Sequence, residues 1–83
     1  MKITRAYFEL KLEDRETIYL FKNGIFYLAL NEDVILLKKL GLKNKIVPLG
    51  IYDIKMGFLI NEKDKLEKIL EDKNIKYKFI ETY

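Results

Sequence analysis

The sequence predicts a mixed α/β (α+β) domain, in which one mixed β-sheet of about five strands is flanked by two to three helices. Three observations predict it. Apolar runs flank Asn23-Gly24, the pattern most typical of a β-hairpin. Two later segments have the apolar spacing and end residues of helices, and strand-like sequence follows each. A chain of 83 residues has room for one core, so we expect residues 1–83 to be a single domain.

The first segment, Ile3 to Asp14, is open to two interpretations. Some of its residues alternate as in a strand, while others lie on one side of a helix. The alternating set is Phe8, Leu10 and Leu12, and the helical set is Ala6, Tyr7, Leu10 and Glu13. We favour a short helix.

A hairpin comes next. The segment 17–22 is rich in β-branched and aromatic residues, and the segment 25–30 is apolar throughout. A type I′ turn requires positive φ at both central residues, which Asn and Gly tolerate well. We therefore expect two antiparallel strands joined at Asn23-Gly24.

A helix is expected from about residue 32 to residue 40. Asn31 stands at the N-cap position, acidic residues occupy the first turn, Lys38 and Lys39 occupy the last, and Gly41 follows. The segment has little polar face, so it should lie buried against the sheet.

Two strands should follow this helix. Residues 44–52 contain Pro48, which cannot donate to a central ladder, so they predict a broken or edge strand. Residues 54–60 predict a further strand.

The chain should close with a helix and a strand. Asn61 is placed to cap a helix over residues 62–73, whose apolar stripe recurs at helical spacing. Asn74 fits the end of that helix, and residues 75–81 alternate as a half-exposed final strand.

The residue types argue against catalysis. The chain contains neither histidine nor cysteine, so the usual general base, nucleophile and soft metal ligands are missing. The four glycines form no phosphate-binding motif, and the acidic residues between residues 62 and 72 are interleaved with lysines as on a solvent-exposed helix. Glu13, Asp14 and Glu16 are expected to be solvated turn residues. We therefore expect no enzymatic activity, no cofactor and no metal.

The same composition predicts a cytoplasmic protein without membrane contact. A small domain with no cysteine suits a reducing compartment. No apolar segment resembling a signal peptide follows Lys2 and Arg5. The longest apolar run, Ile25 to Leu30, is far shorter than the roughly 20 residues of a membrane helix.

The distribution of charge suggests a polyanionic partner. The formal charge is +3, and between Asp33 and Asp53 the chain carries lysines but no acid. These lysines are Lys38, Lys39, Lys43 and Lys45. They could face phosphates while aromatic side chains stack on bases, or they could simply keep the protein soluble.

The order of several motifs points to a known family. Tyr-Phe-Glu-Leu-Lys at 7–11 precedes Ile-Tyr-Leu-Phe-Lys-Asn-Gly-Ile-Phe-Tyr at 18–27, and an acidic helix start, Met-Gly-Phe at 56–58, a helix and a strand follow. This order resembles the N-terminal domain of MutS DNA mismatch repair proteins over nearly the whole chain. The resemblance implies a MutS N-terminal domain-like sheet and contact with DNA from the minor-groove side.

The resemblance also implies residue roles. In the family, a phenylalanine wedges against a mispaired base, and this residue falls on Phe26. The family's glutamate, which hydrogen-bonds the displaced base, falls on Leu28, which can accept no hydrogen bond. The family's ATPase domain has no counterpart in this chain.

Two functions therefore stand as hypotheses. The first is a DNA-binding domain for mismatched or distorted DNA, without ATPase activity, in which Phe26 stacks and Lys22, Lys43 and Lys45 hold phosphates. The second is a protein-interaction or regulatory module of a repair or mobile-element complex. An exposed Phe26 beside a basic patch favours DNA, whereas a buried Phe26 favours a protein partner.

Overall fold

The computed structural model describes residues 2–83, without the side chain of Lys2. The helices and strands follow one another in the order that the sequence predicts. They are α1 (Lys2–Glu13), β1 (Ile18–Asn23), β2 (Phe26–Leu30), α2 (Asn31–Lys39), β3 (Ile46–Leu49), β4 (Asp53–Leu59), the 3₁₀ turn η1 (Ile60–Glu62), α3 (Lys63–Asp72) and β5 (Tyr77–Ile80). The N-terminal segment is thus a helix, and the expected mixed α+β class is confirmed.

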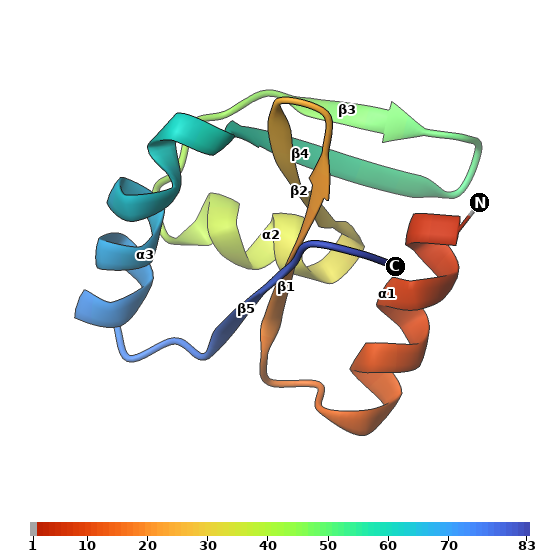
Figure 1. Cartoon of the computed structure of the whole chain (residues 1–83), viewed down its shortest axis with the longest axis horizontal. Helices are drawn as coiled ribbons and strands as arrows, with labels where there is room; N and C mark the ends of the chain where they lie inside the picture. The colour runs from red at the N-terminus through yellow and green to blue at the C-terminus, as the bar shows by residue number, and fades with distance from the viewer. Residues whose placement is uncertain (1) are drawn as a thin grey trace.

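The five strands form one mixed sheet in the order β3-β4-β2-β1-β5. The β1–β2, β2–β4 and β3–β4 pairs are antiparallel, and β5 runs parallel to β1. The sheet is strongly twisted, so β3 and β4 cross the direction of the β1–β2 hairpin (Figure 1). As expected, the strand that contains Pro48 lies at an edge, where a missing N–H donor breaks no central ladder.

Helices cover both faces of the sheet. Alternate side chains of each strand point to opposite faces, and each face has its own apolar cluster. On the α1 face, the cluster is Ile3, Tyr7, Tyr19, Phe21, Leu28 and Leu30. On the α2/α3 face, it is Ile18, Leu20, Tyr27, Ala29, Val34, Leu37, Met56, Phe58, Leu66 and Leu70.

The hairpin turn lies one residue later than the sequence predicts. Asn23 is still in β1 and pairs with Phe26, so the two central residues are Gly24 and Ile25. Gly24 has φ +64° and Ile25 has negative φ, which is the pattern of a type II′ turn rather than type I′. The register is set by burial, because pairing Phe21 with Leu28 keeps both on the α1 face.

The predicted helix N-caps are wrong. Asn31 has φ +48° and caps nothing; its amide donates to Asp53 at 3.0 Å and its amide oxygen accepts from the N–H of Ile54 at 2.9 Å. Because α2 starts directly after β2, the chain must turn at Asn31, and asparagine tolerates the left-handed conformation. Asn61 lies within η1, and the residue before α3, Glu62, makes no side-chain cap bond.

The helix C-termini match the prediction. Gly41 has φ +98° and Asn74 has φ +57°. After α2, the N–H of Leu42 donates to the carbonyl of Leu37. After α3, the N–H of Ile75 donates to the carbonyl of Leu70. Both ends have the bond of a Schellman motif, which requires a left-handed residue at this position.

A buried ion pair joins α1 to α2. Lys11 Nζ lies 2.6 Å from Asp33 Oδ1, and the two side chains are only 9% and 2% exposed. Lys11 also donates to the carbonyl of Thr17 at 2.7 Å, while Asp33 Oδ2 accepts from the N–H of Tyr19 at 3.1 Å. Burial raises the pKa of Asp33 even with Lys11 beside it.

Within residues 2–83, no helix is long and apolar enough to cross a membrane.

Candidate nucleic-acid interface

The end of the sheet that carries the β1–β2 turn is apolar and exposed. Ile25, Phe26, Leu59 and Ile60, which we call the tip patch, are each at least 39% exposed. Phe26 pairs with Leu59 across β2 and β4, and the N–H of Ile60 donates to the carbonyl of Ile25 at 2.9 Å. The turn projects at the periphery of the molecule (Figure 1). These contacts hold four apolar residues from three elements in one surface.

Phe26 is neither sealed in the core nor fully extended into solvent. It lies on the same side of β2 as Leu28 and Leu30, which is the α1 face. Its ring packs on Gly57 of β4: a Cβ at Gly57 would lie 3.3 Å from Phe26 Cδ1 and 3.7 Å from Cγ. One side of the ring is therefore supported by the strand, and the side chain remains 40% exposed.

Lys43 and Lys45 lie near this surface. The segment that carries them runs beside β4, because the amide of Asn44 donates to the carbonyl of Gly57 at 2.8 Å. Leu42 and Asn44 turn toward the α2/α3 face, where they line a cavity of about 70 Å³ with Phe58 and Leu66. Lys43 and Lys45 flank Asn44 in the sequence, and both are exposed.

Lys55 lies on the face of the sheet that carries Phe26. It stands two residues before Gly57 on β4 and is half-buried, so it shares the side of Gly57 and Phe26. Asp53 lies further back along the same strand, where it accepts from Asn31. Within the described part of the chain, Lys43, Lys45 and Lys55 have no carboxylate at ion-pair distance. Lys55 lies opposite Leu30, at the other end of β2 from Phe26, and Glu62 of η1 lies next to Leu42 and Asn44.

Lys22 is not part of this surface. It pairs with Tyr27 and lies on the α2/α3 face, opposite to Phe26. Its Nζ is 3.8 Å from Glu81 Oε1, and the other oxygen of Glu81 accepts from the Tyr27 hydroxyl at 2.7 Å. This bond from the phenol to a carboxylate raises the pKa of Tyr27 to about 12. The structure thus places Lys43 and Lys45 on either side of Asn44, which is bonded to Gly57 beneath the Phe26 ring, and places Lys22 on the opposite face.

The acidic residues near the end of α1 form a turn. Asp14 accepts from the Thr17 hydroxyl at 2.7 Å, from the N–H of Glu16 at 3.0 Å and from Lys76 at 3.1 Å. The bonds from Thr17 and then Lys76 lower the pKa of Asp14 to about 2. Among the residues that the structure describes, no group of three or more acidic side chains is placed to hold a metal ion.

Sequence reasoning missed Lys55, Gly57, Leu59 and Ile60 as members of the site. Their role depends on β4 lying next to β2, with Leu59 opposite Phe26. The apolar end of the predicted strand over residues 54–60 was the only available signal, and it did not reveal the pairing partner.

A scan against protein-family models and a search of curated proteins both find no match for this chain. The resemblance to the MutS N-terminal domain therefore stays a prediction. Fold and surface define a small α+β domain with an aromatic, lysine-flanked patch at one end of its sheet.

Proposed function

We propose that this chain is a DNA-binding domain that contacts mismatched or otherwise distorted DNA through the tip patch. One observation supports it most: Phe26 is exposed, and the exposed Lys43 and Lys45 flank Asn44, which is bonded to Gly57 beneath the ring. The lysines supply contacts to phosphates that do not depend on sequence, and the aromatic ring supplies a contact to a base. No step of such binding needs an ATPase or a cofactor.

Recognition would rest on stacking and not on hydrogen bonds to the base. Leu28, where the resemblance puts the family's glutamate, is buried in the α1-face cluster. It offers no acceptor and cannot reach a ligand. A base that has lost its pairing partner is cheaper to unstack, so an aromatic contact favours distorted sites. We propose that the domain acts in the cytoplasm, consistent with its lack of cysteine.

The proposal is tested by fluorescence anisotropy with labelled matched duplex, mismatched duplex and single-stranded DNA at two salt concentrations. We expect weak binding, with a Kd on the order of 10⁻⁴ to 10⁻⁶ M, that falls steeply as salt rises. Lys43→Gln combined with Lys45→Gln should weaken binding to every ligand and flatten the salt dependence. If that double variant bound as the parent does, the lysines would have no part in binding.

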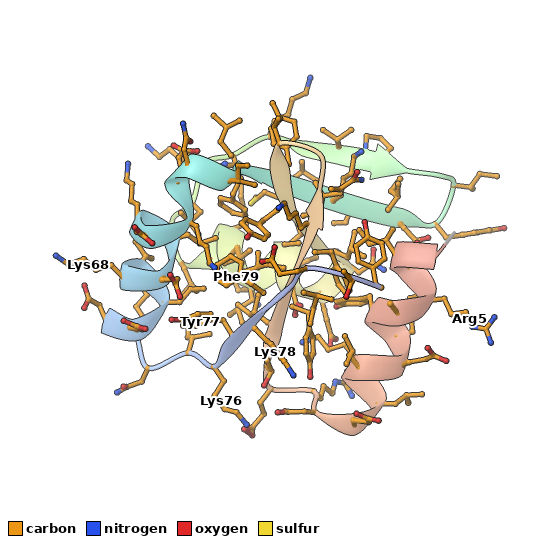
Figure 2. The ribbon with its side chains drawn as sticks, viewed as in Figure 1. Arg5, Lys68, Lys76, Tyr77, Lys78 and Phe79 are labelled. Carbon is orange, nitrogen blue, oxygen red and sulfur yellow. The ribbon has the colours of Figure 1, made fainter. Side chains whose placement is uncertain are left out.

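Two single lysine variants serve as controls. Lys68 is exposed and projects outward from α3 at the side of the molecule (Figure 2), and Lys22 lies on the opposite face from Phe26. Lys68→Gln and Lys22→Gln change the net charge by the same amount as either site lysine. We expect each to cost less affinity than Lys43→Gln or Lys45→Gln, because neither lies beside Phe26.

A protein-interaction or regulatory module is the second candidate function. Ile51 and Tyr52, in the turn between β3 and β4, are 89% and 92% exposed, which is unusual for two consecutive large apolar residues. If the parent bound no DNA at low salt, this second function would become the better proposal.

A further inference from the structure

Gly57 of β4 supports one side of the Phe26 ring, and this packing limits which form of nucleic acid can contact the ring. Building on the proposed function, we infer that the ligand is a single-stranded nucleic acid with an unpaired base stacked on the outer side of the Phe26 ring. In this arrangement Gly57 is the positioning residue, because it lets the ring lie against β4. The inference specifies that the contacted base is unpaired and belongs to a single strand, whereas the proposed function specifies that DNA binds.

A side chain that wedges into a duplex enters between base steps, so it must stand clear of its own protein. Phe26 does not stand clear, since its Cγ and Cδ1 pack on the backbone of Gly57. Its neighbour Leu59 is about as exposed as Phe26 itself, and Ile25 is more exposed. The tip patch therefore exposes only the outer side of the Phe26 ring. One exposed aromatic side suits a base that is unstacked and turned outward from a single strand.

Gly57 determines how closely the Phe26 ring lies against β4. A methyl group at this position would meet Phe26 Cδ1 at 3.3 Å and Leu28 Cδ2 at 3.6 Å. Leu28 is buried and cannot move away easily, so the Phe26 ring is the group that must shift. Gly57 itself has an ordinary strand φ, so an alanine there imposes no backbone strain. Gly57→Ala thus changes the position of the ring and leaves the fold in place.

Two lysines lie near the strand that supports the ring. Lys43 and Lys45 flank Asn44, whose amide donates to the carbonyl of Gly57 on β4. A row of cations next to an aromatic platform is how proteins follow the backbone of a single strand. DNA and RNA single strands share this chemistry, so both are included in the test.

The decisive experiment uses Phe26→Trp as an internal reporter. The chain has no tryptophan, so the variant carries one indole, whose fluorescence is quenched when a base stacks on it. The full chain is titrated with twelve-nucleotide poly(dT), poly(U), an abasic oligonucleotide of the same length and a matched duplex. We expect quenching by poly(dT) or poly(U), little quenching by the abasic strand, and at least tenfold weaker binding of the duplex.

Gly57→Ala is then measured by anisotropy in the chain with native Phe26. It should weaken poly(dT) binding by less than the roughly five- to a hundredfold that loss of one stacked base costs, because the ring needs to move only a few tenths of an ångström, while binding of the abasic strand stays unchanged because the lysines are intact. If Gly57→Ala fails to fold, as judged by circular dichroism, the tryptophan quenching still decides the question.

Three results distinguish failure of the single-strand inference from failure of the proposed DNA binding. Equal or tighter binding of the duplex without tryptophan quenching would overturn the single-strand inference and leave the proposed DNA binding intact. Equal quenching by the abasic strand and poly(dT) would also overturn it, because no base is then needed. No binding to any ligand at low salt would overturn the proposed function, and the inference with it.

Discussion

Replacing Lys11 by methionine should strongly destabilise the protein. The Asp33 carboxylate is 2% exposed, and Lys11 Nζ is its charged partner at 2.6 Å. Without Lys11 that carboxylate keeps the N–H of Tyr19, while the carbonyls of Arg15 and Thr17 lose a donor. Breaking one partner of a buried ion pair costs about 3 to 5 kcal/mol. This is a large share of the roughly 4 to 12 kcal/mol expected for a chain of this length.

The cost should depend on pH. Burial raises the pKa of Asp33, and removal of Lys11 raises it further, since a nearby cation favours the charged form. A carboxyl group whose folded pKa lies above its unfolded value contributes stability below the unfolded pKa and loses it as pH rises through the folded pKa. Lys11→Met should therefore cost least near pH 3 and most at neutral pH.

Urea denaturation followed by circular dichroism at pH 3, 5 and 7 measures this cost. The matched control is Lys11→Met combined with Asp33→Asn, which removes the orphaned charge and keeps an acceptor for Tyr19. The double variant should recover more than half of the loss at pH 7, and its cost relative to the parent should change less with pH than that of Lys11→Met. A cost below about 1 kcal/mol at pH 7, or one that does not change with pH, would refute the role assigned to the buried pair.

Three further predictions concern turns. The pKa of Asp14 is lowered to about 2, so its carboxylate stabilises the fold above the ordinary aspartate pKa, and this stabilisation is lost as pH falls toward 2. Asp14→Asn should therefore be less stable than the parent at neutral pH. In urea titrations the stabilities of the two proteins should converge in acid. Asn31→Ala should lower the free energy of unfolding by about 1 to 3 kcal/mol in the same assay, because it puts alanine at φ +48° and removes two hydrogen bonds to β4. Equal urea midpoints for variant and parent would contradict this. Gly24→Ala should cost about 1 kcal/mol through backbone strain alone, since nothing lies within 4 Å of the added methyl group; an unchanged melting temperature would show that the turn relaxes freely.

Local patterns predicted most of the elements in this chain. Gly41 and Asn74 marked helix ends, because a left-handed C-terminal residue is a local requirement. Pro48 marked an edge strand for a similar reason. The N-caps failed because Asn31 satisfies groups on β4, which are distant in sequence, and not the N–H groups of its own helix.

The candidate site was predicted only in part, because sheet register decides it. Lys22 is four residues from Phe26 in sequence, yet the two-residue turn puts them on opposite faces. Lys43 lies far from Phe26 in sequence, and its segment comes close to β4 through the bond between Asn44 and Gly57, while β4 pairs with β2. Such pairings between distant segments leave no local signal.

The central claim is that the exposed ring of Phe26 contacts nucleic acid. Its most direct test is the affinity of Phe26→Ala for a labelled single-stranded oligonucleotide at low salt, compared with that of the parent chain. Phe26 is 40% exposed and belongs to neither apolar cluster, so the variant should still fold, which circular dichroism checks. We predict binding at least fivefold weaker, from the loss of about 1 to 3 kcal/mol of stacking. A folded variant that binds as tightly as the parent would contradict the claim.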